Sequence, residues 1–370
     1  MHIYVPNYYS KFSCIGSRCQ DNCCIGWEID IDQDTCRRYL QEQGAFGERL
    51  RSHIDTRDIP HFILGEHERC PFLNADNLCD IHITLGEDAL CRICTMHPRF
   101  VDQFGERGEI GLGLACEEAA RCILCADQPF AVVLSETDAP AFYAESEPND
   151  PALIEDFLAA RDQLFTLLQD TQLSLEVRLV SILLYGSALQ AAYEQDTDNF
   201  HDLCHQPQDP ATMARPLIHH DPQHSLDALR TLFADLDYMD TPWKSAVDTA
   251  LSRSVAALQQ AGPRIQSFLS PTLLSNFAVY LLFRYFLKAM RDGDILGKIQ
   301  LAVVGVVLLY ALIAANDRPD LPCILRQAQL FSKEIEYSED NISALADAFI
   351  EDPALDILPL CSLCEVAINL

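Results

Sequence analysis

Apolar and polar positions follow the pattern of amphipathic helices from about residue 150 onward. Asp150, Thr241 and Ser270 each precede a proline, which is typical of a helix start. The polar side chain can accept a free backbone N–H, and proline lacks only an N–H that would be unpaired there. The pattern predicts helices over about 151–169, 173–195, 223–236, 242–261, 271–292, 294–315, 322–337 and 341–350.

One segment is apolar throughout. Residues 301–315, LAVVGVVLLYALIAA, are fifteen positions without a charge. A membrane-spanning helix needs about twenty apolar residues, so we predict a helix buried on all sides of a bundle and no transmembrane span. Peripheral association with a membrane is the alternative.

The first 130 residues predict short, mixed elements. WEIDID at 27–32 alternates like a half-exposed strand, 34–43 and 117–126 predict helices, and 99–114 predicts a hairpin turning near Gly105 and Gly108. Asp34 is the expected N-cap of the first helix. Small units with few long elements commonly need a staple such as a metal in place of a large core.

These patterns predict a mainly α protein. A small cysteine-rich α+β domain, stapled by metal, occupies 1–130, and an irregular all-α domain occupies 151–370. The segment 131–150 is acidic, holds prolines and lacks periodicity, so it is expected to be a linker.

Composition and charge exclude some classes of function. The chain has 370 residues, 49% of them hydrophobic, and a formal net charge of −29. It can bury a sizeable core, and it will not bind nucleic acid through a general phosphate-neutralising surface. The opening residues MHIYVPNYYSKF carry no apolar run, so we expect no secretory signal and a cytoplasmic location. Disulfides are rare in that reducing compartment.

The cysteines are unevenly placed. Of sixteen, twelve lie before residue 126, whereas cysteines used as apolar filler should scatter with the core. Thiolates are soft ligands that suit zinc or iron–sulfur clusters. The spacing matches neither zinc fingers nor ferredoxins. The radical S-adenosylmethionine signature is absent as well, because Gly26 stands where its third cysteine would be.

Four segments resemble a known family. They are YVPNYYSKFSCIGSRCQDNCCIGWEIDID, CPFLNADNLCDIHITLGEDALC, CTMHPRF and GLGLACEEAAR. They resemble the flagellin lysine-N-methylase (FliB) family, which shares its cysteine pattern with a broader class of zinc- or iron-chelating proteins. The resemblance is specific over residues 4–125 and thins beyond about 150.

The resemblance implies a bacterial enzyme that transfers methyl groups from S-adenosylmethionine to lysine amines of flagellin. It further implies an iron–sulfur cluster of the [4Fe-4S] type, with zinc as the alternative metal. Carried over position by position, the metal ligands are Cys14, Cys19, Cys23, Cys24, Cys70, Cys79, Cys94 and Cys116. Cys36, Cys91, Cys122 and Cys125 lie outside the recognised pattern.

Eight cysteines exceed the four that one cubane needs. We expect one cluster, and a second, zinc-like site is the alternative. The lysine must lose a proton before it attacks a methyl group. Asp30 and Asp32 are candidates for the base, although a solvated strand face is the preferred explanation of these two residues. The sequence shows no recognisable S-adenosylmethionine site.

Two other functions remain open on the sequence. The chain could be a non-catalytic interaction protein whose cysteine-rich domain is held folded by zinc. It could also be an iron–sulfur protein that serves electron transfer or redox sensing. The helical half is larger than an electron carrier requires and would suit a scaffold for a protein substrate.

Overall fold

A computed structural model describes residues 1–135, 150–195, 198–210 and 220–370, and it confirms a mainly α fold. The chain forms two compact units. We call residues 11–100 and 112–119 the cysteine-rich unit, and residues 1–10, 101–111 and 120–370 the helical unit.

These bounds differ from the division predicted at residues 130 and 150, because a small sheet ties the chain start to the helical unit. Its strands are β1 His2–Pro6, β4 Arg99–Phe104, β5 Arg107–Leu112 and β6 Val132–Leu134, in the order β4-β5-β1-β6. Strand β1 runs parallel to β5 and antiparallel to β6. The predicted hairpin is confirmed as β4 and β5, with Gly105 at a φ of 56° in its turn. Most of the predicted linker lies outside the described residues.

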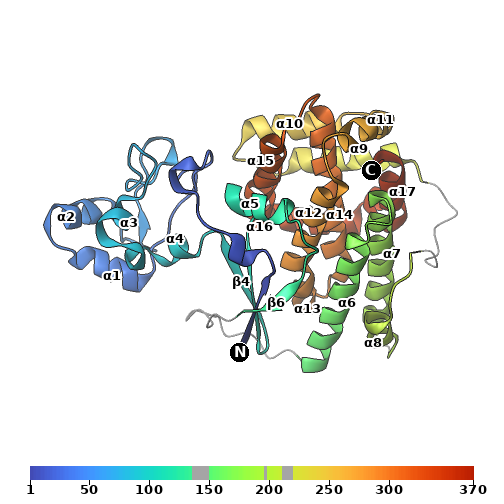
Figure 1. The fold of residues 1–370 in the computed structure, drawn as a ribbon, viewed down its shortest axis with the longest axis horizontal. Coiled ribbons are helices and arrows are strands. Elements are labelled where there is room, and N and C mark those ends of the chain that lie inside the picture. The colour runs from blue at the N-terminus through green and yellow to red at the C-terminus, as the bar shows by residue number, and fades with distance from the viewer. Residues whose placement is uncertain (136–149, 196–197, 211–219) are drawn as a thin grey trace. The chain divides into compact units, whose positions relative to one another are not determined.

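The helical unit is a bundle of helices, shown in Figure 1. It contains the end of α5 (Glu117–Leu124) and the helices α6 Pro151–Gln169, α7 Leu175–Glu194, α8 Asp198–His205, α9 Pro222–Asp235, α10 Thr241–Leu251, α11 Val255–Gln266, α12 Pro271–Tyr285, α13 Ala289–Asp292, α14 Ile295–Ala315, α15 Leu321–Phe331, α16 Glu339–Glu351 and α17 Ile357–Ala367. Helix α14 packs against α7, α10 and α12, and its residues 301–314 are all buried.

The prediction of a buried central helix over 301–315 is therefore confirmed. By length and composition alone, the segments Leu175–Glu194, Pro271–Asp292 and Ile295–Ala315 could each cross a membrane. Most of each apolar stretch is buried inside the bundle.

Several predicted boundaries were wrong for local reasons. The helix expected over 242–261 is two helices, because the Ser254 side chain caps a new start at α11. Asp240, rather than Thr241, caps α10. Asp150 and Ser270 cap α6 and α12 as predicted. Helices α8 and α17 were not predicted.

The cysteine-rich unit contains short elements. They are α1 Gln33–Gln41, α2 Gly44–Ser52, β2 Ile54–Asp55, β3 His61–Phe62, α3 Asp80–Leu85 and α4 Arg92–Met96. No strand forms over 27–32 within this described unit; Asp30 makes only an isolated bridge with His61. Asp32, rather than Asp34, caps α1. The core beside these elements includes Tyr39, Phe62 and Phe72.

Candidate metal centre

Backbone hydrogen bonds bring three predicted ligands together although they are far apart in the sequence. The Cys70 N–H donates to the Cys24 carbonyl oxygen at 2.9 Å. Leu73 and Cys79 form an antiparallel bridge across the turn that follows Cys70. Because the main chain itself fixes these contacts, Cys24, Cys70 and Cys79 are held on neighbouring segments before any metal binds.

Two further thiols lie at the start of α4. Cys91 precedes the helix and Cys94 lies within it, and their Sγ atoms are 3.4 Å apart. The Tyr39 hydroxyl donates to the carbonyl oxygen of Ala89 at 2.6 Å and so fixes the loop that carries Cys91. Cys91 completes what we call the first thiol set: Cys24, Cys70, Cys79, Cys91 and Cys94.

The thiols of the first thiol set lie close enough to shift one another's pKa values. Burial raises the pKa of Cys70 to about 11, and the nearby Cys79 and Cys91 contribute. The pKa of Cys94 is raised first by the hydrogen bond to Cys91 and then by burial, with Cys24 and Cys70 adding to it. The same contact with Cys94 lowers the pKa of Cys91. Several thiolates can coexist here only beside a cation.

The remaining four predicted ligands form a second thiol set: Cys14, Cys19, Cys23 and Cys116. Burial raises the pKa of Cys116 to about 11, with Cys23 and Cys14 as the neighbouring thiols that add to the rise. Burial also raises the pKa of Cys19 to about 12. The Cys19 Sγ lies 3.5 Å from a Glu117 oxygen, which also accepts the Gln20 N–H at 2.8 Å.

The adjacent Cys23 and Cys24 thus face different neighbours, although they also interact with each other. All eight predicted ligands lie in the cysteine-rich unit. Cys91 lies outside the predicted ligands but beside Cys94, and the two-residue gap between these cysteines was the signal for their proximity. Cys36 is buried beside Asp32, whereas Cys122 and Cys125 belong to the helical unit.

The donor chemistry of the first thiol set fits an iron–sulfur cluster. A cubane takes four thiolates, and this set offers five on segments fixed by main-chain bonds. Four thiolates also suit zinc.

The candidate base Asp32 is not free for proton transfer, because it accepts backbone N–H groups from Thr35 and Arg92 at 2.9 and 2.8 Å. Burial raises the pKa of Asp32, but these bonds outweigh burial and lower it overall.

Arg49 joins the segments that carry two ligands. Its guanidinium donates to an Asp80 carboxylate oxygen at 2.7 Å and to the Pro71 carbonyl oxygen at 2.6 Å. Pro71 follows Cys70 and Asp80 follows Cys79. Arg49 also lies over the Phe72 ring, 5.1 Å from its centroid, so it braces the first thiol set from outside.

A buried charged cluster lies inside the helical unit. The Tyr280 hydroxyl donates to the Glu336 carboxylate at 2.9 Å, and Arg284 Nε lies 3.2 Å from the same oxygen. Burial lowers the pKa of Arg284, but the neighbouring Tyr280 and Glu336 outweigh burial and raise it overall. Tyr280 also lines a small cavity with Tyr8 and Asn276, which has room for about one water molecule.

Comparison with known proteins identifies the helical unit. The model of the FliB lysine N-methylase C-terminal domain matches residues 161–363, more than half of the chain. The chain belongs to the FliB lysine N-methylase family. The match lies where the sequence resemblance was expected to thin, so that expectation was wrong. The Glu336 cluster falls within the matched range.

Individual relatives agree with this family. The chain is 34% identical over 142 residues to a "Lysine-N-methylase" of Salmonella typhimurium, and 35% identical over 138 residues to one of Salmonella choleraesuis. Each alignment covers 35% of this chain and 34% of the relative. The chain is also 34% identical to the "Flagellar biosynthetic protein FliU" of Salmonella muenchen, covering 80% of that protein. The chain thus aligns with about a third of the length of the first two relatives. No solved structure matches it.

Proposed function

We propose that this chain is a cytoplasmic protein-lysine N-methyltransferase that transfers methyl groups from S-adenosylmethionine to flagellin lysines. The observation that carries the proposal is the family match over residues 161–363. The printed names of the relatives, a lysine N-methylase and a flagellar biosynthetic protein, support the reaction and the substrate class.

The proposal includes an iron–sulfur cluster held by the first thiol set. Cys24, Cys70, Cys79 and Cys94 are the four proposed ligands, with Cys91 as a fifth thiol beside them. When bound, such a cluster would supply redox-active iron, and its cationic core would offset the negative charge of the thiolates. The chain's own contribution is to hold four sulfurs on braced segments, where Cys70 is buried and Cys24, Cys79 and Cys94 are half-buried.

Lysine methylation also needs an acceptor for the ammonium proton, because the free amine is the nucleophile. Glu336, the last residue of the π-helical turn Ser332–Glu336, is not free for this role, because its buried carboxylate is already paired with Arg284 and accepts the Tyr280 hydroxyl.

The reaction is tested by co-expressing the chain anaerobically with a flagellin from the same organism. We expect the flagellin mass to rise in steps of about 14 Da, one methyl group each. Iron and sulfide should copurify with the chain in near-equal amounts. Unmodified flagellin beside folded, iron-replete protein would contradict the methylation proposal, and colourless protein carrying only zinc would contradict the cluster.

A further inference from the structure

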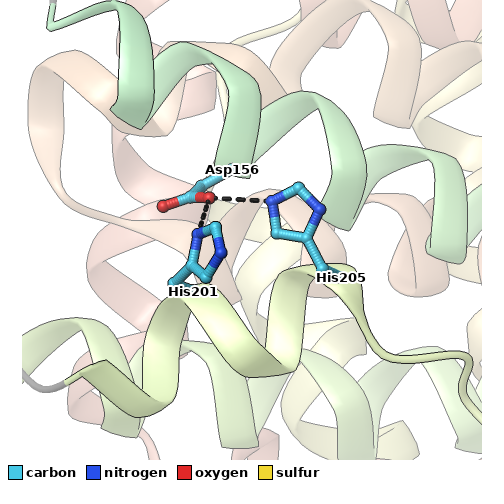
Figure 2. Close-up of side chains that lie close together, drawn as sticks. All are labelled: Asp156, His201 and His205. Carbon is cyan, nitrogen blue, oxygen red and sulfur yellow. Dashed lines mark hydrogen bonds and ion pairs between the residues drawn. The ribbon is translucent and has the colours of Figure 1, made fainter.

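A second constellation of metal-ligand side chains lies in the helical unit, where α6 packs against α8. The ligand atoms of Asp156, His201 and His205 all lie within 4.8 Å of one another. Figure 2 shows both imidazoles directed at one carboxylate oxygen of Asp156. His201 Nδ1 is 2.7 Å and His205 Nε2 is 2.9 Å from that oxygen.

The sequence of α8 explains why these side chains meet. His201 and His205 are four residues apart, so they project from one face of the helix. The neighbouring Phe200 is buried and packs on Phe157 of α6 with ring centroids 5.6 Å apart. Because Asp156 precedes Phe157, docking this apolar face places the carboxylate beneath both histidines.

We infer that Asp156, His201 and His205 form a binding site for a divalent transition metal of the zinc type. Two imidazole nitrogens and one carboxylate oxygen are a common ligand set for such ions. In a tetrahedral zinc site with bonds of about 2.0 Å, neighbouring donor atoms are about 3.3 Å apart. The two nitrogens lie about half an ångström closer to the oxygen than donor atoms in such a site.

The exposed side chains of the two histidines let an ion reach the three ligands from solvent. The side chain of His201 is 65% exposed, that of His205 is 35% exposed, and that of Asp156 is 14% exposed. An ion held by the three would keep a position open to water, unlike the closed coordination of structural zinc sites. The acidic charge of the chain, −29 overall, would raise the local concentration of cations.

This site is distinct from the thiol sets in its donor atoms. It offers nitrogen and oxygen in the helical unit, whereas the thiol sets offer sulfur in the cysteine-rich unit. The buried Cys204 lies between the two histidines in sequence. Burial and then the Asp156 charge raise its pKa to about 12, so it stays a neutral thiol beside the site. An ion there would tie α6 to α8.

The experiment uses full-length, anaerobically isolated protein, dialysed with Zn²⁺ against a weak chelator. Zinc and iron are then counted per chain in the wild type, His201→Gln, Asp156→Asn and the control His224→Gln. His224 is an exposed histidine on α9, outside this group. We expect the wild type and His224→Gln to retain one more zinc ion than the other two variants, with equal iron in all four.

Zinc X-ray absorption supplies a second readout, which is the identity of the atoms that surround the zinc ion. In the difference between wild type and His201→Gln, the lost zinc should show nitrogen and oxygen neighbours with imidazole scattering. If His201→Gln folds poorly, judged by circular dichroism, His205→Gln replaces it. Equal zinc retention in all folded variants, or a lost zinc ion surrounded by sulfur, would overturn the inference and leave the three side chains as a hydrogen-bonded cluster.

Discussion

Arg161 of α6 and Glu109 of β5 form a doubly hydrogen-bonded ion pair, with Nη1–Oε2 and Nη2–Oε1 both at 2.7 Å. The two side chains are 1% and 2% exposed. Arg107 Nε donates to the same carboxylate at 2.7 Å. The pair fastens the small sheet to the first long helix of the helical unit.

Removing Arg161 from this ion pair should lower the free energy of unfolding substantially. Arg161→Leu leaves the Glu109 carboxylate buried with Arg107 alone, and breaking a buried pair costs about 3–5 kcal/mol. Urea unfolding measures the loss. Arg230→Leu is the control, because Arg230 and Asp248 form a solvent-exposed pair whose loss should change the free energy of unfolding far less. Similar losses of unfolding free energy in both variants would show that the buried pair stabilises the fold no more than the exposed pair does.

Glu109 should also give the protein an acid-sensitive component of stability. Burial raises the pKa of Glu109, but Arg161 and then Arg107 outweigh burial, so it lies below its ordinary value of about 4.3. The stabilisation is complete above that value and is lost as the pH falls through the lower folded-state pKa. Thermal unfolding from pH 7 to pH 3 should therefore show a shallower acid-side decline in Glu109→Gln. Parallel curves would exclude the contribution.

Cysteine variants should separate ligands from filler. Cys79→Ser and Cys94→Ser each remove a proposed cluster ligand, so iron content and folding should fall together. Cys204→Ser replaces a buried thiol in the helical unit and costs about 1–3 kcal/mol if its hydroxyl finds no partner. It should keep its iron. Iron and sulfide analysis checks this, and equal iron loss in all three would refute the division.

Arg49→Leu should loosen the first thiol set without removing a ligand. It breaks the bonds to Asp80 and Pro71, so we expect lower iron occupancy and faster loss of iron to a chelator. Arg37→Leu is the control, since Arg37 pairs with Asp34 on the surface of α1 with both side chains largely exposed. Identical chelation rates in the two variants would contradict a bracing role for Arg49.

The hydrophobic pattern alone determined much of the helical unit. The buried run at 301–315 became α14, and Asp150 and Ser270 capped the helices they were predicted to cap. These features are local: periodicity and capping depend on residues a few positions apart. The pattern also separated a cysteine-rich part from a helical part, although β1 crosses that division by pairing with β5 and β6.

Tertiary structure decided which side chains share a site. The sequence supplied eight cysteines, but only folding sorts them into two sets, adds Cys91 to the first and places Cys23 and Cys24 among different neighbours. Likewise, no spacing rule links Asp156 to His201, because the link arises where α8 docks on α6. Such sites depend on contacts between distant segments, whose register is set by core packing and main-chain hydrogen bonds rather than by local sequence.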